Sequence, residues 1–119
     1  MANPDLINVT SVLGGNAGFN LTNTATATLI TVDADHICKI NRITCANVDG
    51  TNSATVDLFV DGLGSGASGV TTTGADATVY LAKTVAVPAD TTLVILDTPI
   101  YLMEGDILKG GASANSDLD

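Results

Sequence analysis

Apolar and polar residues alternate in short runs along most of this chain, and clusters of turn-forming residues separate the runs. In residues 53–61, for example, Val56, Leu58 and Val60 share one face of an extended segment. A period of two residues bounded by Gly, Pro, Asp and Asn is typical of β-strands, and no long window has the apolar spacing of an amphipathic helix. The pattern therefore predicts an all-β protein. The expected strands cover residues 6–13, 19–32, 36–48, 53–61, 78–87, 92–96, 100–103 and 107–109.

The same alternation assigns faces to the expected strands. In residues 36–48 the apolar positions before Asn41 and those after Arg42 have opposite parity, so we expect a β-bulge there, which inserts one residue and reverses the faces. The inward-facing apolar residues of two strands are the predicted core. They are Val56, Leu58, Val60, Leu93 and Ile95.

Two residues of the strand predicted over 78–87 stand out as surface candidates. Tyr80 has the parity opposite to the inward residues, so we expect it to be exposed. Lys83 has the inward parity although it is charged, so it either lies near a sheet edge or marks an interface.

Seven or eight short strands in one chain favour a two-sheet antiparallel β-sandwich, and we expect a jelly-roll-like one. Residues 32–35 and 87–90 have the related sequences Val-Asp-Ala-Asp and Val-Pro-Ala-Asp, which we interpret as two equivalent corners. We expect residues 1–18 to form an extended arm and residues 19–119 to form the sandwich domain. The last ten residues are small and polar apart from Leu118, so either a closing strand is missing or a partner completes the sheet.

Charge narrows the range of partners. The chain has 119 residues with 4 basic and 13 acidic side chains, for a net charge of −9, which excludes the cationic surface that nucleic acid needs. Glu104 is the sole glutamate, and the aspartates fall mostly in expected turns, so the strand faces are neutral and available to neighbours. No apolar run approaches the roughly 20 residues of a membrane helix, so we expect no membrane partner.

Candidate chemistry is sparse, and we expect neither an enzyme nor a cofactor. The GxGxxG pattern at residues 64–69 lacks a following helix, so we interpret it as a loop. His36 is the only histidine, and we interpret it as a strand-end residue at a turn. Cys38 and Cys45 would lie about 23 Å apart on one strand, too far for a disulfide, so we expect free thiols.

Two binding chemistries remain open as alternatives. Hard oxygen ligands suit Ca²⁺, and several aspartates could converge at strand ends. These are Asp33, Asp35, Asp57, Asp61, Asp76 and Asp90. Glycan binding would need exposed aromatic rings, but we assign Phe19 and Phe59 to the core, which leaves Tyr80 as the exposed ring that we expect.

Four segments carry a resemblance to a known group of proteins. They are Lys-Ile-Asn-Arg-Ile at 39–43, Ala-Asn-Val-Asp-Gly-Thr-Asn-Ser-Ala-Thr-Val at 46–56, Leu-Ala-Lys-Thr-Val-Ala-Val-Pro-Ala-Asp-Thr-Thr-Leu at 81–93 and Pro-Ile-Tyr-Leu-Met-Glu-Gly-Asp at 99–106. Together they resemble small β-sandwich structural proteins of tailed bacteriophages, closest to those of marine and cyanobacterial phages. Members of that group usually continue with a further strand after the Gly-Asp hairpin, whereas this sequence soon ends.

The resemblance implies a non-enzymatic virion protein made in the host cytoplasm and located on the capsid surface. It implies a capsid decoration, or cement, protein that bridges subunits of the major capsid protein and associates with other copies of itself, with a trimer favoured. A neck, tail or fibre component is the alternative within the same group, and a glycan- or calcium-dependent binding module is the alternative from another class. The contact residues we expect are Leu6, Ile7 and Val9 of the arm, with Tyr80 and Lys83.

Overall fold

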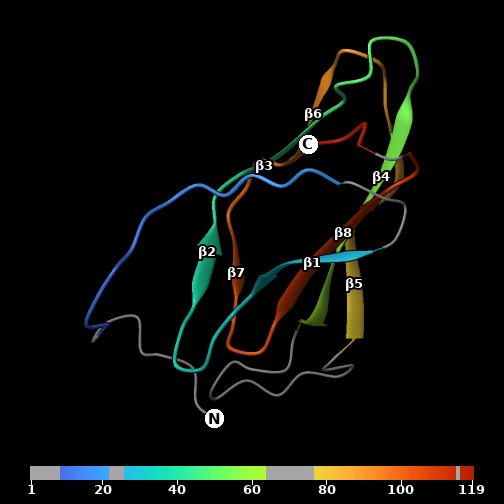
Figure 1. Ribbon diagram of the computed structural model, residues 1–119. Helices are drawn as coiled ribbons and strands as arrows, with labels where there is room; N and C mark the ends of the chain where they lie inside the picture. Colours follow the sequence, from blue (N-terminus) through green and yellow to red (C-terminus); the bar gives the residue numbers. More distant parts are fainter. Residues whose placement is uncertain (1–8, 22–25, 64–76, 115) are drawn as a thin grey trace.

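The computed structural model describes residues 9–21, 26–63, 77–114 and 116–119, and within these ranges it contains strands and turns but no helix (Figure 1). The all-β prediction is therefore confirmed. The strands are β1 (Ala27–Thr31), β2 (Cys38–Ile40), β3 (Ile43–Ala46), β4 (Ala54–Leu63), β5 (Ala77–Val87), β6 (Thr92–Leu96), β7 (Ile100–Leu102) and β8 (Ile107–Ala112).

All the strand pairs are antiparallel. Four strands form a sheet in the order β1-β8-β4-β5, while β2 pairs with β7 and β3 pairs with β6. The sequence predicted one strand over residues 36–48 with a bulge at Asn41 and Arg42. Instead, β2 ends before these two residues and β3 begins after them, and the two strands have different partners. Since β6 and β7 also follow each other directly, the two pairs are successive halves of one bent ribbon.

The core lies on the inward side of β4 and β8. Val56, Leu58 and Val60 of β4 are buried, as predicted, and Leu93 and Ile95 of β6 are partly buried and pack against them. The core cluster also includes Cys45 of β3 and Leu102 of β7, so the ribbon and the four-stranded sheet share one apolar interior.

The predictions near the N-terminus were largely wrong. Residues 9–20 form no regular secondary structure and are all exposed, whereas strands were expected over 6–13 and from residue 19. Apart from a single bridge at Leu21, the described part of the second expected strand begins only at Ala27. Alternation alone does not make a strand, because a strand also needs a neighbour for its backbone hydrogen bonds, and residues 9–20 pair with no strand in the described chain. The remaining residues of both expected strands, 6–8 and 22–25, lie outside the described ranges.

The two related corners at residues 32–35 and 87–90 are equivalent turns, as predicted. Each begins with a buried valine and ends with an aspartate at positive φ, 60° for Asp35 and 55° for Asp90. In each, the amide after that aspartate donates a hydrogen bond to a carbonyl three residues earlier. The hairpin between β7 and β8 repeats the arrangement, with Leu102 buried and Gly105 at φ 86°.

The C-terminal residues form an ordered part of the fold. Leu118 is fully buried, with 0% of its surface exposed, and forms β-bridges to both Leu21 and Asn47. The amides of Ala46 and Asp119 each donate to the other residue's carbonyl at 2.9 Å. Residues 117–119 therefore pair with the end of β3. The sequence had suggested a missing closing strand or a partner instead.

Asn47 is the buried polar residue that joins these elements. Its Nδ2 donates to the carbonyls of Asn52 at 3.0 Å and Val87 at 2.8 Å, and its Oδ1 accepts from the Asp49 amide at 2.9 Å. Its own amide donates to the Thr91 carbonyl. One side chain thus links the end of β3 to the loop before β4 and to the end of β5.

We expect Asn47→Ala to lower the free energy of unfolding by about 2 to 3 kcal/mol, because one buried and two part-buried hydrogen bonds are lost. Chemical denaturation measures the loss. The control is Asn52→Ala, which removes an exposed side-chain bond to Asp49 and should cost less than about 1 kcal/mol. Equal effects of the two substitutions would contradict the role given to Asn47.

Candidate interaction surfaces

The outward side of β4 and β5 carries a small aromatic and cationic cluster. Phe59 and Tyr80 are partners in the strand register, and their ring centroids lie 5.1 Å apart. The Lys83 Nζ lies 4.7 Å from the centre of the Tyr80 ring, a cation–π distance. Tyr80 is 45% exposed, as predicted, while Phe59 is half-buried on this outer side and not in the core, where the sequence placed it. Phe59, Tyr80 and Lys83 are called the outer-face cluster below.

A β-bulge in β5 turns Lys83 outward. Val56 pairs with Val85 and Leu58 pairs with Ala82, so Asp57 between them faces two residues, Lys83 and Thr84. The bulge moves Ala82 into the buried position that parity had given to Lys83. Because β5 is an edge strand, the expectation that Lys83 lies near a sheet edge is confirmed.

The bulge depends on an unusual backbone conformation. Thr84 has φ 52°, a region that β-branched residues rarely adopt, and its amide donates to the Asp57 carboxylate. We therefore expect Thr84→Gly to leave the free energy of unfolding unchanged or to raise it by up to about 1 kcal/mol. In the same strand, Ala86→Gly should lower it by about 0.5 to 1 kcal/mol. Denaturation of the two variants side by side measures the difference, and a larger loss for Thr84→Gly would contradict the assigned conformation.

An ion pair lies beside the outer-face cluster. Lys109 Nζ of β8 is 2.5 Å from Asp61 Oδ2 of β4, and the Thr78 hydroxyl donates to Asp61 Oδ1 at 2.6 Å. The hydrogen bond from Lys109, followed by that from Thr78, holds the pKa of Asp61 below its usual value. At a turn, the hydrogen bonds from Asn52 and from the Thr51 amide lower the pKa of Asp49 in the same way.

These two aspartates set the expected response to acid. Because their folded-state pKa values lie below the unfolded value of 3.8, their stabilising contribution is complete above that value and is lost as the pH falls through the folded pKa. We therefore expect the unfolding midpoint to fall on acidification below about pH 4. The double variant Asp49→Asn, Asp61→Asn should show a flatter acid limb than Asp97→Asn, a change at an exposed loop residue. Parallel acid limbs would contradict the assignment.

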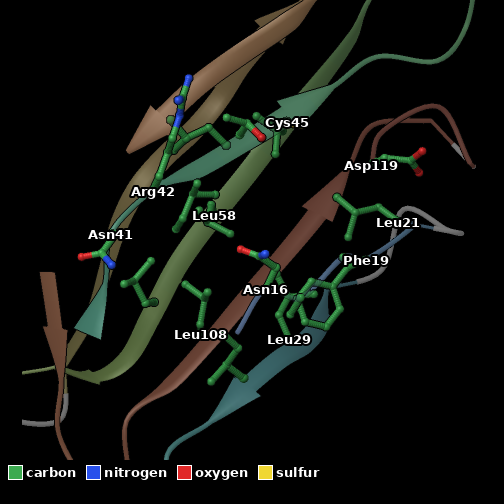
Figure 2. Close-up of a pocket in the computed structure, with 18 of the residues that line it drawn as sticks. Asn16, Phe19, Leu21, Leu29, Asn41, Arg42, Cys45, Leu58, Leu108 and Asp119 are labelled. Carbon is green, nitrogen blue, oxygen red and sulfur yellow. The ribbon is translucent and has the colours of Figure 1, made fainter. Parts of the chain in front are cut away.

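A large cleft lies between the four-stranded sheet and the segment that runs from β2 to β3. Its volume is about 1060 Å³. Figure 2 shows Leu58 and Leu108 on the sheet wall, with Phe19 and Leu21 on the N-terminal side. Protein interiors are close-packed, so a cleft of this size lined by core side chains is a part of the core that the described residues do not cover completely. The other apolar residues that line it include Leu29, Ile30, Cys38, Ile40, Ile43, Cys45, Val56 and Ile95.

Both cysteines line the cleft, and both are free thiols, as predicted. Cys38 on β2 is half-buried. Cys45 on β3 is buried, and burial, followed by the nearby charge of Asp119, raises the pKa of its thiol. A raised pKa keeps Cys45 protonated and unreactive near neutral pH.

The described aspartates among those proposed for calcium do not form a cluster that could hold the ion. Asp57 and Asp61 lie on the outward side of β4, whereas Asp33 and Asp35 lie at the turn after β1. Among the described residues, no group of three or more His, Cys, Asp or Glu side chains could hold a metal ion. Asp76 and the glycine-rich pattern at 64–69 lie outside those residues. His36, by its Nδ1, contacts the Ala34 carbonyl at 2.7 Å, which fits a turn residue.

The two most exposed large apolar residues of the described chain, Val12 and Leu13, lie before the first strand. Val9 is 44% exposed, whereas Leu6 and Ile7 lie outside the described ranges. Sequence reasoning missed Val12 and Leu13, which are 84% and 90% exposed, and it misplaced Phe19, which is 39% exposed at the cleft. The signal was present in the sequence, because a glycine pair follows Leu13 and interrupts any strand there.

Comparison with known proteins gives no relative, since no family model, no curated protein and no solved structure matches the chain. Nor does the part of the chain described by the structure contain a helix that could span a membrane.

Proposed function

We propose that this protein is a structural virion protein of a tailed bacteriophage, and that it decorates the capsid by bridging subunits of the major capsid protein. The observation that carries the proposal is the exposed N-terminal segment, residues 9–20. It has no charged residue in a chain of net charge −9, yet it presents Val12 and Leu13 almost fully to solvent. Such a segment fits a docking function, because apolar side chains contribute to stability only once a partner covers them.

The finer fold belongs to the same proposal. Residues 19–119 form a jelly-roll-like sandwich, with β1-β8-β4-β5 as one sheet and the bent ribbon of β2-β3 and β6-β7 as the other. The shared apolar core supports this arrangement, and so do the repeated corners that connect one layer to the other. Residues 1–18 form the arm that precedes it.

The resemblance to phage structural proteins gains physical support from where its segments lie. They supply most of β2, the loop from β3 to β4, most of β5 with the corner after it, and β7 with the hairpin after it, which are framework elements of the fold.

In this proposal the protein acts as a ligand that binds the assembled capsid shell and not its free subunits. Binding to the mature state alone stabilises it by mass action, and several weak contacts on one oligomer add through avidity. The proposed contacts are the arm, with Leu6, Ile7 and Val9, for neighbouring subunits, and Tyr80 and Lys83 of the outer-face cluster for the capsid. The net charge of −9 suits an outward position, away from packaged DNA.

Deleting residues 1–18 should abolish capsid binding while leaving the fold intact, because the described residues of this range make no strand pairing. Co-sedimentation with capsids that lack the protein measures binding, and circular dichroism checks the fold. The finer variant, Val12→Ser with Leu13→Ser, should weaken binding, whereas Val48→Ser, at an exposed position elsewhere, should not. Capsids saturated by the truncated protein would overturn the role of the arm.

Copy number per virion separates decoration from a neck, tail or fibre function on the same scaffold. Quantitative mass spectrometry against the major capsid protein should give on the order of hundreds of copies for an icosahedral shell. A dozen copies or fewer would exclude capsid decoration and support the alternative.

A further inference from the structure

We infer that the cleft is the docking site for the N-terminal arm of a second copy of this chain, so that copies assemble by exchanging arms. The inference identifies the neighbour of the arm as another copy of the same chain. It rests on the proposed function in one respect, namely that the decoration protein works as an oligomer. Its two halves are both present in the single chain, since Val9, Val12 and Leu13 of the arm are exposed and the described residues leave the apolar cleft open.

The cleft lacks a strand at its mouth. Within the described chain, β2 forms backbone hydrogen bonds with β7 alone and β1 pairs with β8 alone, so each has one open edge. Residues of both strands line the cleft, with Leu29 and Ile30 from β1 and Cys38 and Ile40 from β2. Unpaired edges beside an uncovered apolar surface are a template for an added strand, which gives main-chain hydrogen bonds and side-chain burial together.

The neighbouring part of the same wall shows what such a strand does. Residues 117–119 lie beside the end of β3 with hydrogen bonds from Ala46, Val48 and Asp119, and Leu118 is buried there. No described segment does the same for β2. The β2 edge without a described partner therefore continues the β3 edge, which residues 117–119 already cover.

The arm has the composition for this position. Val9 and Leu13 share the parity of one strand face, and residues 9–20 carry no charge. This uncharged stretch adds nothing to the repulsion that two copies of charge −9 feel on approach. The cleft lining also contains Lys39 and Arg42, two of the four basic residues of the chain, against the single acid Asp119.

The described arm residues 9–14 do not line the cleft of their own chain. Residues 15–20 line the cleft, but the lining begins at Gly15, and Val12 and Leu13 before it are exposed. Fully extended, residues 1–14 span at most about 50 Å, which is long enough to reach an adjacent molecule. An arm that leaves one cleft and enters the next makes a head-to-tail contact, which closes into a ring such as a trimer.

Cys38 makes the inference testable, because this native thiol lies in the proposed docking site. In a Cys45→Ser background, Val9→Cys and Leu13→Cys should each form a disulfide with Cys38 of another copy when purified protein is treated with diamide. Non-reducing gels should then show covalent oligomers. Ala86→Cys, at an exposed position of β5 outside the cleft, should stay at the monomer position of about 12.0 kDa. Adding Cys38→Ser should abolish the oligomers.

A second measurement keeps the test independent of cross-linking. In analytical ultracentrifugation the full chain should sediment as a multiple of 12.0 kDa, and the chain lacking residues 1–18 should sediment as a folded monomer. A disulfide to Cys38 within one chain, no disulfide at Cys38, or an oligomer that survives the deletion would each overturn the inference. Since no capsid is present, these outcomes are separate from the failure of capsid binding.

Discussion

The backbone pairing of the C-terminal residues with β3 is the constraint on which the rest of the structure depends. Leu118 is fully buried between Leu21 and Asn47, so one short segment holds the start of the domain, the end of β3 and the core together. Asn47 extends this connection to the end of β5 through its side-chain amide. The half of the ribbon that contains β3 is therefore covered, while no segment of the described chain pairs with the other edge of β2.

The location of the charged residues affects how the open edge of β2 can meet a neighbour. Charge is concentrated in turns, where aspartates accept backbone hydrogen bonds, as Asp49 does from the Thr51 amide. Few charges remain on the outer strands, where Lys39 is the one charged side chain of β2 and Lys83 that of β5. A chain built in this way is suited to contact with neighbours, and the cleft and the arm are the places where such contact would bury the most apolar surface.

The sequence predicted the strands that have local signals. Residues 54–63 and 92–96 were found close to the expected bounds, because alternation and flanking turns are local properties. It did not predict the partner change at Asn41 or the bulge at Thr84, since both depend on which strand lies alongside. Leu118 was missed as a core residue for the same reason, because its partners Leu21 and Asn47 are distant in sequence. The exposure of Tyr80, an expected contact residue, followed from parity, whereas that of Leu13, which was not among the expected contacts, was missed.

The most direct measurement of the central claim is hydrogen exchange of the β2 and β3 amides as a function of protein concentration. The account predicts that the β2 amides facing away from β7 exchange quickly in dilute protein and become protected as copies associate, while the β3 amides paired with the C-terminal residues stay protected throughout. Protection of β2 that is independent of concentration would contradict the account, because it would mean that the edge is already covered within one chain.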